Sequence, residues 1–242
     1  MKIFGISDLH LSFSVANKSM SVFGSHWHEH WRKIGDSWRS MIGADDIVLV
    51  CGDISWGLRP SDAEKDLEWL SELPGRIVLT RGNHDYWWQS INRMRQAYPR
   101  LNFIQNDALT FGGVSVCGTR GWPLPGSDEF NEQDQKIYER ELSRLRLAVG
   151  ALDEKAQYRV AMFHYPPLFS DQLDTEFTAI LEQAHIDLCV YGHLHQAHFD
   201  PQRVDLDHNG IAYRLISSDY LGFTPRQLWP APQPPETAAS AE

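Results

Sequence analysis

The amino-acid sequence predicts a layered α/β fold. Short apolar runs recur along the 242 residues, and segments with helical periodicity lie between many of them. Hydrophobic residues make up 42% of the chain and charged residues 22%, which is close to the composition of ordinary globular domains. No apolar run approaches the ~20 residues that a membrane-spanning helix needs. We therefore expect one globular domain that is not inserted in a membrane and, by default, a cytoplasmic protein.

The strands are predicted from short apolar runs that are bounded by turn residues. Stretches without helical periodicity, near residues 101–118 and after His195, predict that part of the sheet is antiparallel. The predicted strands are Ile3–Ser7, Ile47–Cys51, Arg76–Thr80, Leu101–Ile104, Val114–Gly118, Arg159–Phe163, Asp187–Tyr191 and Tyr213–Ser217.

The helices are predicted from apolar residues at three- and four-residue spacing. The first such face consists of Trp27, Trp31, Ile34, Trp38 and Met41. A second helix is expected to start at Pro60 with a capping box formed by Ser61 and Glu64, and to stop at Pro74. Three more helices are expected at Tyr86–Ala97, Asp128–Val149 and Thr175–Ala184.

The domain is expected to span residues 1–224. From Pro225 to residue 242 the sequence is rich in Pro, Ala, Ser and Glu and has no apolar period, so we expect a mobile C-terminal tail over residues 225–242. Cys51, Cys117 and Cys189 form no C-x-x-C pair and lie in or at the ends of apolar runs, which is typical of buried thiols in a reducing compartment.

The net charge of −10 bears on the choice of partner. An acidic surface repels polyanions, whereas proteins that bind nucleic-acid backbones usually neutralise phosphates with Lys and Arg. The composition therefore argues against long nucleic acid as a partner, and it gives no indication of the oligomeric state.

Polar residues follow several of the predicted strands directly. In α/β sheets the loops at the carboxyl ends of strands converge over a crevice, so one cluster is the simplest interpretation. Taken alone, each Asp or Asn is more often a helix cap or turn residue, and each His is more often structural. The joint pattern favours a site, because independent turns would not produce it after successive strands. The residues are Asp8, His10, Asp53, Asn83, His84, Asp85, His164, His193 and His195.

These residue types suit two metal ions better than one. Two carboxylates, one amide oxygen and four imidazoles exceed what a single site with an open position can use, but they fill two neighbouring sites that share a carboxylate. Asp53 is the predicted bridge. Two carboxylates only partly neutralise two divalent ions, so the site would attract an anionic phosphate even on an acidic protein. These ligand types do not distinguish between Mn, Fe and Zn.

The motifs together resemble those of the calcineurin-like metallophosphoesterase superfamily. They are Asp8-Leu9-His10, Gly52-Asp53, Gly82-Asn83-His84-Asp85, His164 and Gly192-His193-Leu194-His195. The resemblance implies a four-layer αββα sandwich, in which two mixed sheets lie between helices. It also implies that Asp8, His10, Asp53 and His195 hold one divalent metal ion and that Asp53, Asn83, His164 and His193 hold a second. The family's reaction is in-line attack on phosphorus by a hydroxide that the metals hold.

By the same resemblance, His84 is a catalytic residue beside the ligand Asn83. It would contact a phosphate oxygen or protonate the leaving group. The alternative is a histidine that only orients its loop. We expect Asp85 to support the loop or the metal ligands rather than to bind metal.

Departures from known branches narrow the expected substrate. Gly52-Asp53 is followed by Ile54, Ser55, Trp56 and Gly57. Protein Ser/Thr phosphatases carry an Arg shortly after their Gly-Asp, so we do not expect a protein phosphatase. Hydrolases of UDP-diacylglucosamine carry Arg in place of His84, so this activity is not expected. The double-strand-break repair nucleases share the Gly-Asn-His-Asp motif, but they are longer and bind DNA. The remaining resemblance is to small bacterial phosphohydrolases, including cyclic-nucleotide phosphodiesterases. We expect a phosphodiesterase that acts on a small phosphodiester or nucleotide. The alternatives are a phosphomonoesterase and a non-catalytic scaffold with the same fold.

Other residues are candidates for the walls of the pocket. The segment from Lys18 to His30 follows the first motif and resembles one uncharacterised bacterial subgroup, so we expect it to form a wall. Trp87 and Trp88 could stack on a base, or could be core residues of the following helix. Arg120 could reach a phosphate. His26, His28 and His30 alternate, and alternate residues of a helix do not share a face, so they do not predict a further metal site.

Overall fold

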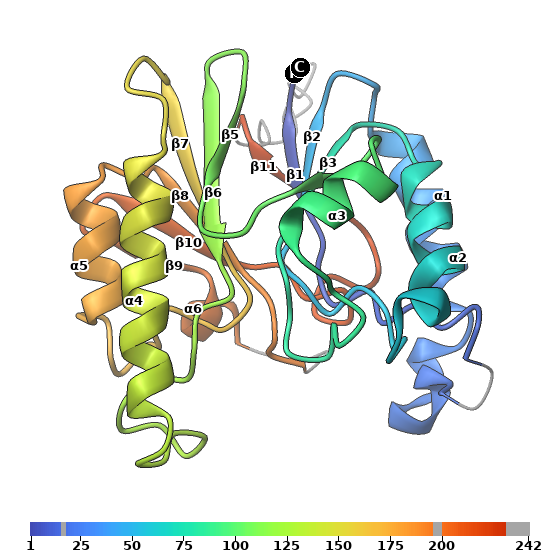
Figure 1. The fold of residues 1–242 in the computed structure, drawn as a ribbon, viewed down its shortest axis with the longest axis horizontal. Helices are drawn as coiled ribbons and strands as arrows, with labels where there is room; N and C mark the ends of the chain where they lie inside the picture. Colours follow the sequence, from blue (N-terminus) through green and yellow to red (C-terminus); the bar gives the residue numbers. More distant parts are fainter. Residues whose placement is uncertain (16–17, 196–199, 231–242) are drawn as a thin grey trace, which may run out of the picture.

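Two β-sheets pack face to face between helices in the computed structural model, which describes residues 1–15, 18–195 and 200–230 (Figure 1). One sheet has five strands in the order β11-β1-β2-β3-β4, and the other has six in the order β5-β6-β7-β8-β10-β9. Both sheets mix parallel and antiparallel neighbours. The prediction of two mixed sheets flanked by helices is therefore confirmed.

The five-stranded sheet is parallel except at one edge. Its parallel strands are β1 (Ile3–Gly5), β2 (Ile47–Val50), β3 (Arg76–Leu79) and β4 (Asn102–Phe103). The last strand of the chain, β11 (Arg226–Trp229), pairs antiparallel with β1.

The position of β11 corrects the predicted tail. Residues 225–242 were expected to lack regular structure, but Arg226–Trp229 complete the edge of the sheet. A short edge strand needs no internal period, because its pairing partner lies more than two hundred residues away in the sequence. Residues 231–242 lie outside the described residues.

The six-stranded sheet has parallel strands in the centre and a hairpin at each edge. The antiparallel pairs β5–β6 and β9–β10 fall after Leu101 and after His195, as the sequence predicted. The strands are β5 (Ala108–Phe111), β6 (Val114–Thr119), β7 (Tyr158–Phe163), β8 (Leu188–Tyr191), β9 (Leu206–His208) and β10 (Ile211–Leu215).

Alternate side chains of each central strand point into different apolar layers, which explains the unbroken apolar runs. In β2, Ile47 and Leu49 face the other sheet, whereas Val48 and Val50 face the helices. Three apolar clusters result: one between the sheets and one between each sheet and its helices. Three clusters separate four layers, so the αββα order is confirmed.

The helices cover the outer faces of the two sheets (Figure 1). The first sheet is covered by α1 (His30–Met41) and α2 (Pro60–Ser71), with α3 (Ile91–Ala97) near its β4 edge. The second is covered by α4 (Gln135–Gly150) and α5 (Glu176–Gln183), with the short α6 (Pro201–Val204) near β9 and β10. Two 3-10 turns, Met20–Phe23 and Ser25–Trp27, precede α1. None of the helices in the described residues is long and apolar enough to span a bilayer.

Two helix starts and one helix cap differ from the predictions for local reasons. Trp27 lies in a 3-10 turn before α1 rather than in the helix. Helix α2 begins at Pro60 as predicted, but its cap is Arg59, whose N–H donates to Asp62 at 3.0 Å. Helix α4 begins at Gln135 rather than Asp128, because Asp134 ends a turn by accepting from the N–H of Asn131.

The predicted helix over Tyr86–Ala97 begins only at Ile91. The residues before Ile91 form turns that are pinned near the Gly-Asn-His-Asp loop, with the N–H of Trp88 donating to the carbonyl of Asp85 at 3.2 Å. Cys51, Cys117 and Cys189 are buried and unpaired, as expected.

Candidate metal centre

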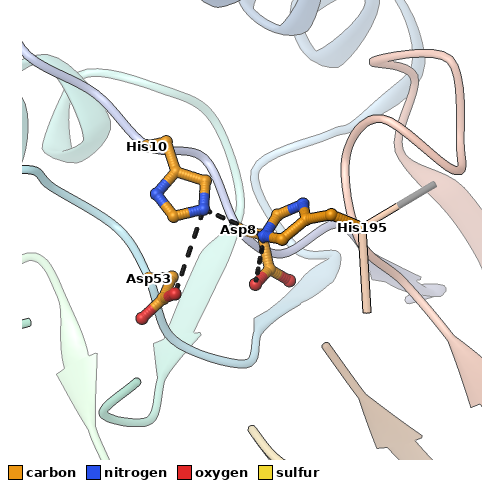
Figure 2. Close-up of side chains that lie close together, drawn as sticks. All are labelled: Asp8, His10, Asp53 and His195. Carbon is orange, nitrogen blue, oxygen red and sulfur yellow. Dashed lines mark hydrogen bonds and ion pairs between the residues drawn. The ribbon is translucent and has the colours of Figure 1, made fainter. Parts of the chain in front are cut away.

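The loops after β1, β2 and β8 bring Asp8, His10, Asp53 and His195 together (Figure 2). One ligand atom from each lies within 4.8 Å of those of the others. The Nε2 atom of His10 lies 3.1 Å from Nε2 of His195 and 3.9 Å from Oδ2 of Asp53. The Nε2 atom of His195 lies 3.6 Å from Oδ1 of Asp8. The first predicted ligand set is thus gathered around one point.

The second predicted set is gathered in part. Asn83 Oδ1 lies 2.5 Å from Nε2 of His164, and that nitrogen lies 3.6 Å from Oδ1 of Asp53. The imidazole of His193 lies beside that of His164, with ring centroids 5.2 Å apart. The Nε2 atom of His193 contacts the carboxylate of Glu129 at 3.3 Å rather than the other predicted ligands of this set. The two oxygens of Asp53 therefore face two different groups of side chains, as a bridging carboxylate would.

Four of the predicted ligands adopt backbone conformations that non-glycine residues rarely adopt. The φ angles are 56° at Asp8, 44° at His10, 50° at Asp53 and 70° at His193. Such a conformation costs on the order of 1–3 kcal/mol per residue and persists only where the surrounding structure enforces it. Here the N–H of Asp8 donates to the carbonyl of Gly52 at 3.1 Å, and the N–H of His10 to that of Asp53 at 3.0 Å. Four of the nine non-glycine residues with positive φ in the described chain are thus predicted ligands, and such conformations are often found at functional sites.

Asp85 ties together the two loops that carry Asp53 and Asn83. Its carboxylate accepts from the N–H groups of Asp53 at 2.9 Å, Ile54 at 2.9 Å and Gly82 at 2.8 Å. The side chain is fully buried, and burial together with the charge of Asp53 raises the pKa of Asp85 to about 7. Asp85 thus supports the loops, as the sequence analysis expected.

Two glycines allow the backbone to approach the carboxylates closely. A Cβ atom at Gly82 would lie 2.1 Å from Oδ1 of Asp53, and one at Gly192 would lie 2.4 Å from Oδ2 of Asp8. Any side chain at either position would displace the carboxylate from the cluster. Steric crowding by these carboxylates therefore explains why glycine occupies the first position of Gly-Asn-His-Asp and of Gly-His-x-His.

Residues after β10 complete the surroundings of the first ligand set, and the sequence analysis missed them. Asp219 accepts from Nδ1 of His195 at 3.2 Å, which leaves Nε2 facing the cluster. Ser217 donates from Oγ to Oδ2 of Asp8 at 3.1 Å, and Ser218 donates to the carbonyl of Asp8 at 2.8 Å. Their place in the sequence could have identified them, because they are polar residues at or directly after the end of a predicted strand, as the predicted ligands are.

The electrostatics of the cluster suit a cation. Burial raises the pKa of Asp8 to about 7 and lowers the pKa of the His10 imidazole. Burial also opposes ionisation of Asp53, but His164, His10 and His84 more than compensate and lower its pKa. Two buried carboxylates among imidazoles are costly without a counterion. Because the oxygen and nitrogen ligands are those that divalent metals prefer, the residues present fit such an ion.

His84 lies beside this cluster without belonging to it. Its N–H donates to Oδ1 of Asp53 at 2.9 Å, so its backbone is fixed on the carboxylate. Its imidazole lies 4.7 Å from the ring of Trp56, measured between centroids, and 37% of the side chain is exposed. His84 is therefore positioned and accessible, which a proton donor needs.

A cavity of about 400 Å³ opens beside the cluster. The segment from Lys18 to His30 supplies part of its wall, as predicted, and Trp56 stacks on His10 with centroids 4.8 Å apart. No Lys or Arg lines this cavity among the described residues. The lining residues are His10, Met20, Phe23, His26, Trp27, Trp56, His84, His195 and Asp219.

The structure does not place the other predicted pocket residues at this cavity. Trp87 and Trp88 are buried in the core between the first sheet and its helices, so the stacking prediction is wrong and the core alternative holds. The indole nitrogen of Trp87 donates to Asp85 at 3.0 Å. The guanidinium of Arg120 lies over Trp122, 4.5 Å from the ring centroid, and lines a different pocket. The nitrogens of His30 bond to carbonyls of Leu9 and Trp27, which is a structural role.

Metal affinity should increase with pH. In the metal-free protein, burial raises the pKa of Asp8 to about 7; burial lowers that of His195, but Asp219 and Asp8 raise it to about 9. Both groups must lose a proton to bind a divalent ion, so protons compete with the metal below these values. We expect affinity to rise about tenfold per pH unit for each proton displaced, more steeply below pH 7 than above it. Competition with a metal-chelating dye measures this; an affinity independent of pH would contradict it.

Three similarities to known proteins bear on the fold and the family. The chain is 36% identical to the gene 66 protein of Mycobacterium phage L5 over 33% of this chain and 37% of that protein. It is 24% identical to a probable cyclic nucleotide phosphodiesterase of Synechococcus over 63% of this chain and 58% of that protein. The structure is similar to GAP50, the anchor in the inner membrane complex of Plasmodium, with a TM-score of 0.54 and 12% identity over 90% of this chain and 72% of that chain.

The matched regions span less than two thirds of the phage and cyanobacterial proteins, and the similarity to GAP50 concerns the fold alone. The decisive match is to a family. Residues 1–197 match the calcineurin-like phosphoesterases, and this range contains every residue of the metal cluster. The chain belongs to the calcineurin-like phosphoesterase family.

Proposed function

We propose that this protein hydrolyses a small phosphodiester with the help of two divalent metal ions. The observation that carries the proposal is the convergence of Asp8, His10, Asp53 and His195 within 4.8 Å at the wall of an aromatic cavity. Family membership supplies the reaction class. A non-catalytic scaffold would not need the strained backbone and buried carboxylates of this cluster.

The first ligand set consists of side chains that face one another, whereas the second is implied by the family resemblance and is gathered only in part. Asp8, His10, Asp53 and His195 would hold one ion, and Asp53, Asn83, His164 and His193 would hold the other. Bound in such a site, divalent ions generate a nucleophile at neutral pH and neutralise charge on the phosphate. Asp53 would be shared by both sets, because its Oδ2 lies 3.9 Å from Nε2 of His10 and its Oδ1 lies 3.6 Å from Nε2 of His164. For His193 to take part, its imidazole must exchange Glu129 for the ion.

The cavity supports a diester with an aromatic or nucleoside substituent. A diester carries less charge than a monoester, and the described lining of the cavity offers imidazoles but no Lys or Arg to balance a second charge. Trp56, which is partly exposed, and Phe23, which is exposed, offer aromatic surface on which a base could stack, an interaction worth about 1–3 kcal/mol per base. The name of the Synechococcus relative, a probable cyclic nucleotide phosphodiesterase, points in the same direction.

A panel of substrates and metals tests this function. The purified chain is assayed with a bis-aryl phosphate, an aryl monophosphate and cyclic nucleotides, each with Mn, Fe and Zn. We expect kcat/KM to be larger for the diesters, because they need less countercharge in the cavity. Monoesters that react tenfold faster or more would favour the phosphomonoesterase. Bound metal without hydrolysis of any ester would favour the scaffold.

A further inference from the structure

A second pocket, of about 240 Å³, is lined by four arginines and shares no lining residue with the aromatic cavity. Arg81 follows β3, Arg120 follows β6, and Arg140 and Arg144 come from α4. The other lining residues are Thr80, Ile104, Gln105, Asn106, Thr119 and Glu141. Positive charge is therefore concentrated at one place on a chain whose net charge is −10.

The single carboxylate in this pocket does not neutralise the arginines. Glu141 is fully buried, and its oxygens are engaged by Thr119 Oγ1 at 2.6 Å and by Arg144 Nη1 at 2.6 Å. The side chains of Arg81, Arg120 and Arg140 form no ion pair or hydrogen bond within the described residues. Clustered arginines repel one another, and the arrangement is stabilised when an anion lies between them.

Three residues of the pocket have side-chain features that suit an anion. The Nε atom of Arg81 is buried and has no hydrogen-bond partner among the described residues, which is costly for a charged group. The guanidinium of Arg120 is stacked on Trp122, 4.5 Å from the ring centroid. The side-chain oxygen Oε1 of Gln105 accepts from the indole of Trp88 at 3.2 Å, which leaves the donors of its amide nitrogen free, and Gln105 lines the pocket.

We propose that this pocket binds a phosphate-class oxyanion at a site that shares no lining residue with the aromatic cavity. The planar forks of arginine match the oxygens of a phosphate, and several donors are unsatisfied without one. The volume corresponds to roughly eight water molecules at about 30 Å³ each, which is enough for a phosphate group with part of its hydration shell. The occupant is either free phosphate or a second phosphate group on the substrate.

Calorimetric titration of the metal-loaded 242-residue chain with inorganic phosphate tests the site. We expect Arg81→Gln and Arg140→Gln each to weaken one binding event about tenfold or more, because each removes a charge-assisted contact. Arg140 is exposed on α4, so its replacement leaves the core intact. Arg146→Gln is the matched control: it removes the same charge from the same helix, is exposed, and does not line the pocket.

The outcomes separate this site from the metal centre. The arginine-dependent binding should persist after a chelator removes the metals, even if the proposed hydrolase activity is absent. Equal affinity and stoichiometry in Arg81→Gln, Arg140→Gln and Arg146→Gln would overturn the proposal.

A kinetic comparison then identifies the occupant. The nitrophenyl ester of thymidine 5′-phosphate is assayed with and without a 3′-phosphate. A lower KM for the 3′-phosphorylated ester that Arg140→Gln abolishes assigns the pocket to the substrate. Equal KM values, with phosphate binding unaffected by substrate, assign it to free phosphate. Both results support an anion site.

Discussion

Replacing Asp53 with Asn should remove tight metal binding and turnover together. The substitution keeps the size of the side chain but removes the charge that faces both groups of ligands, His10 on one side and His164 on the other. A bridging carboxylate holds both ions in register, so we expect the metal content of the purified variant and its kcat to fall in proportion. Elemental analysis and steady-state kinetics on the same preparation measure the two quantities.

Asp66→Asn is the matched control for this experiment. Asp66 is another fully buried aspartate, but it accepts hydrogen bonds from Ser55 and from the N–H of Phe13 and is not a member of the cluster. We expect this variant to keep its metals. Two tightly bound ions and near-normal turnover in Asp53→Asn would refute the bridging assignment.

The parts of the site that could be predicted from sequence are those fixed by local chain geometry. A polar residue directly after a parallel strand must lie at the carboxyl edge of the sheet, so the positions of Asp8, Asp53 and His164 followed from the strand pattern. The four-layer order depended on the resemblance to a family, since the order of strands within a sheet is set by contacts between distant segments.

Other features of the site and fold depend on tertiary contacts between distant residues, which the local sequence pattern does not predict. Trp87 follows the Gly-Asn-His-Asp loop as a substrate-stacking residue would, but its indole turns inward to Asp85. Trp56 lies after Gly-Asp and stacks on His10 at the cavity. The strand β11 exists because the edge of β1 accepts it, and the local sequence of β11 has no period.

The arginine pocket shows the same limit. Arg81, Arg120, Arg140 and Arg144 are spread over more than sixty residues and belong to no motif. From the sequence, Arg120 alone is a candidate to reach a phosphate. The structure places Arg120 among other arginines rather than at the aromatic cavity.

Replacing His84 with Ala should separate chemistry from metal binding. The imidazole lies 4.0 Å from Oδ2 of Asp53 but is not a member of the ligand cluster, so both metals should remain in the variant. If His84 protonates the leaving oxygen, kcat should fall by about 10²–10⁴, the usual range for a lost general acid or base. Added imidazole should restore part of the activity, because the removed side chain leaves space on the exposed side of the cavity.

The dependence on the leaving group decides between the two roles of His84. Diesters with acidic leaving groups, such as nitrophenolate, need little proton transfer in the transition state and should lose least activity in His84→Ala. Diesters with alkoxide leaving groups should lose most. The measurement is kcat against leaving-group pKa for both proteins, together with metal analysis. A histidine that only orients its loop predicts equal losses for every leaving group, or loss of metal along with activity, because the backbone of His84 is bonded to Asp53. A slope that the substitution leaves unchanged would therefore exclude proton donation by this imidazole.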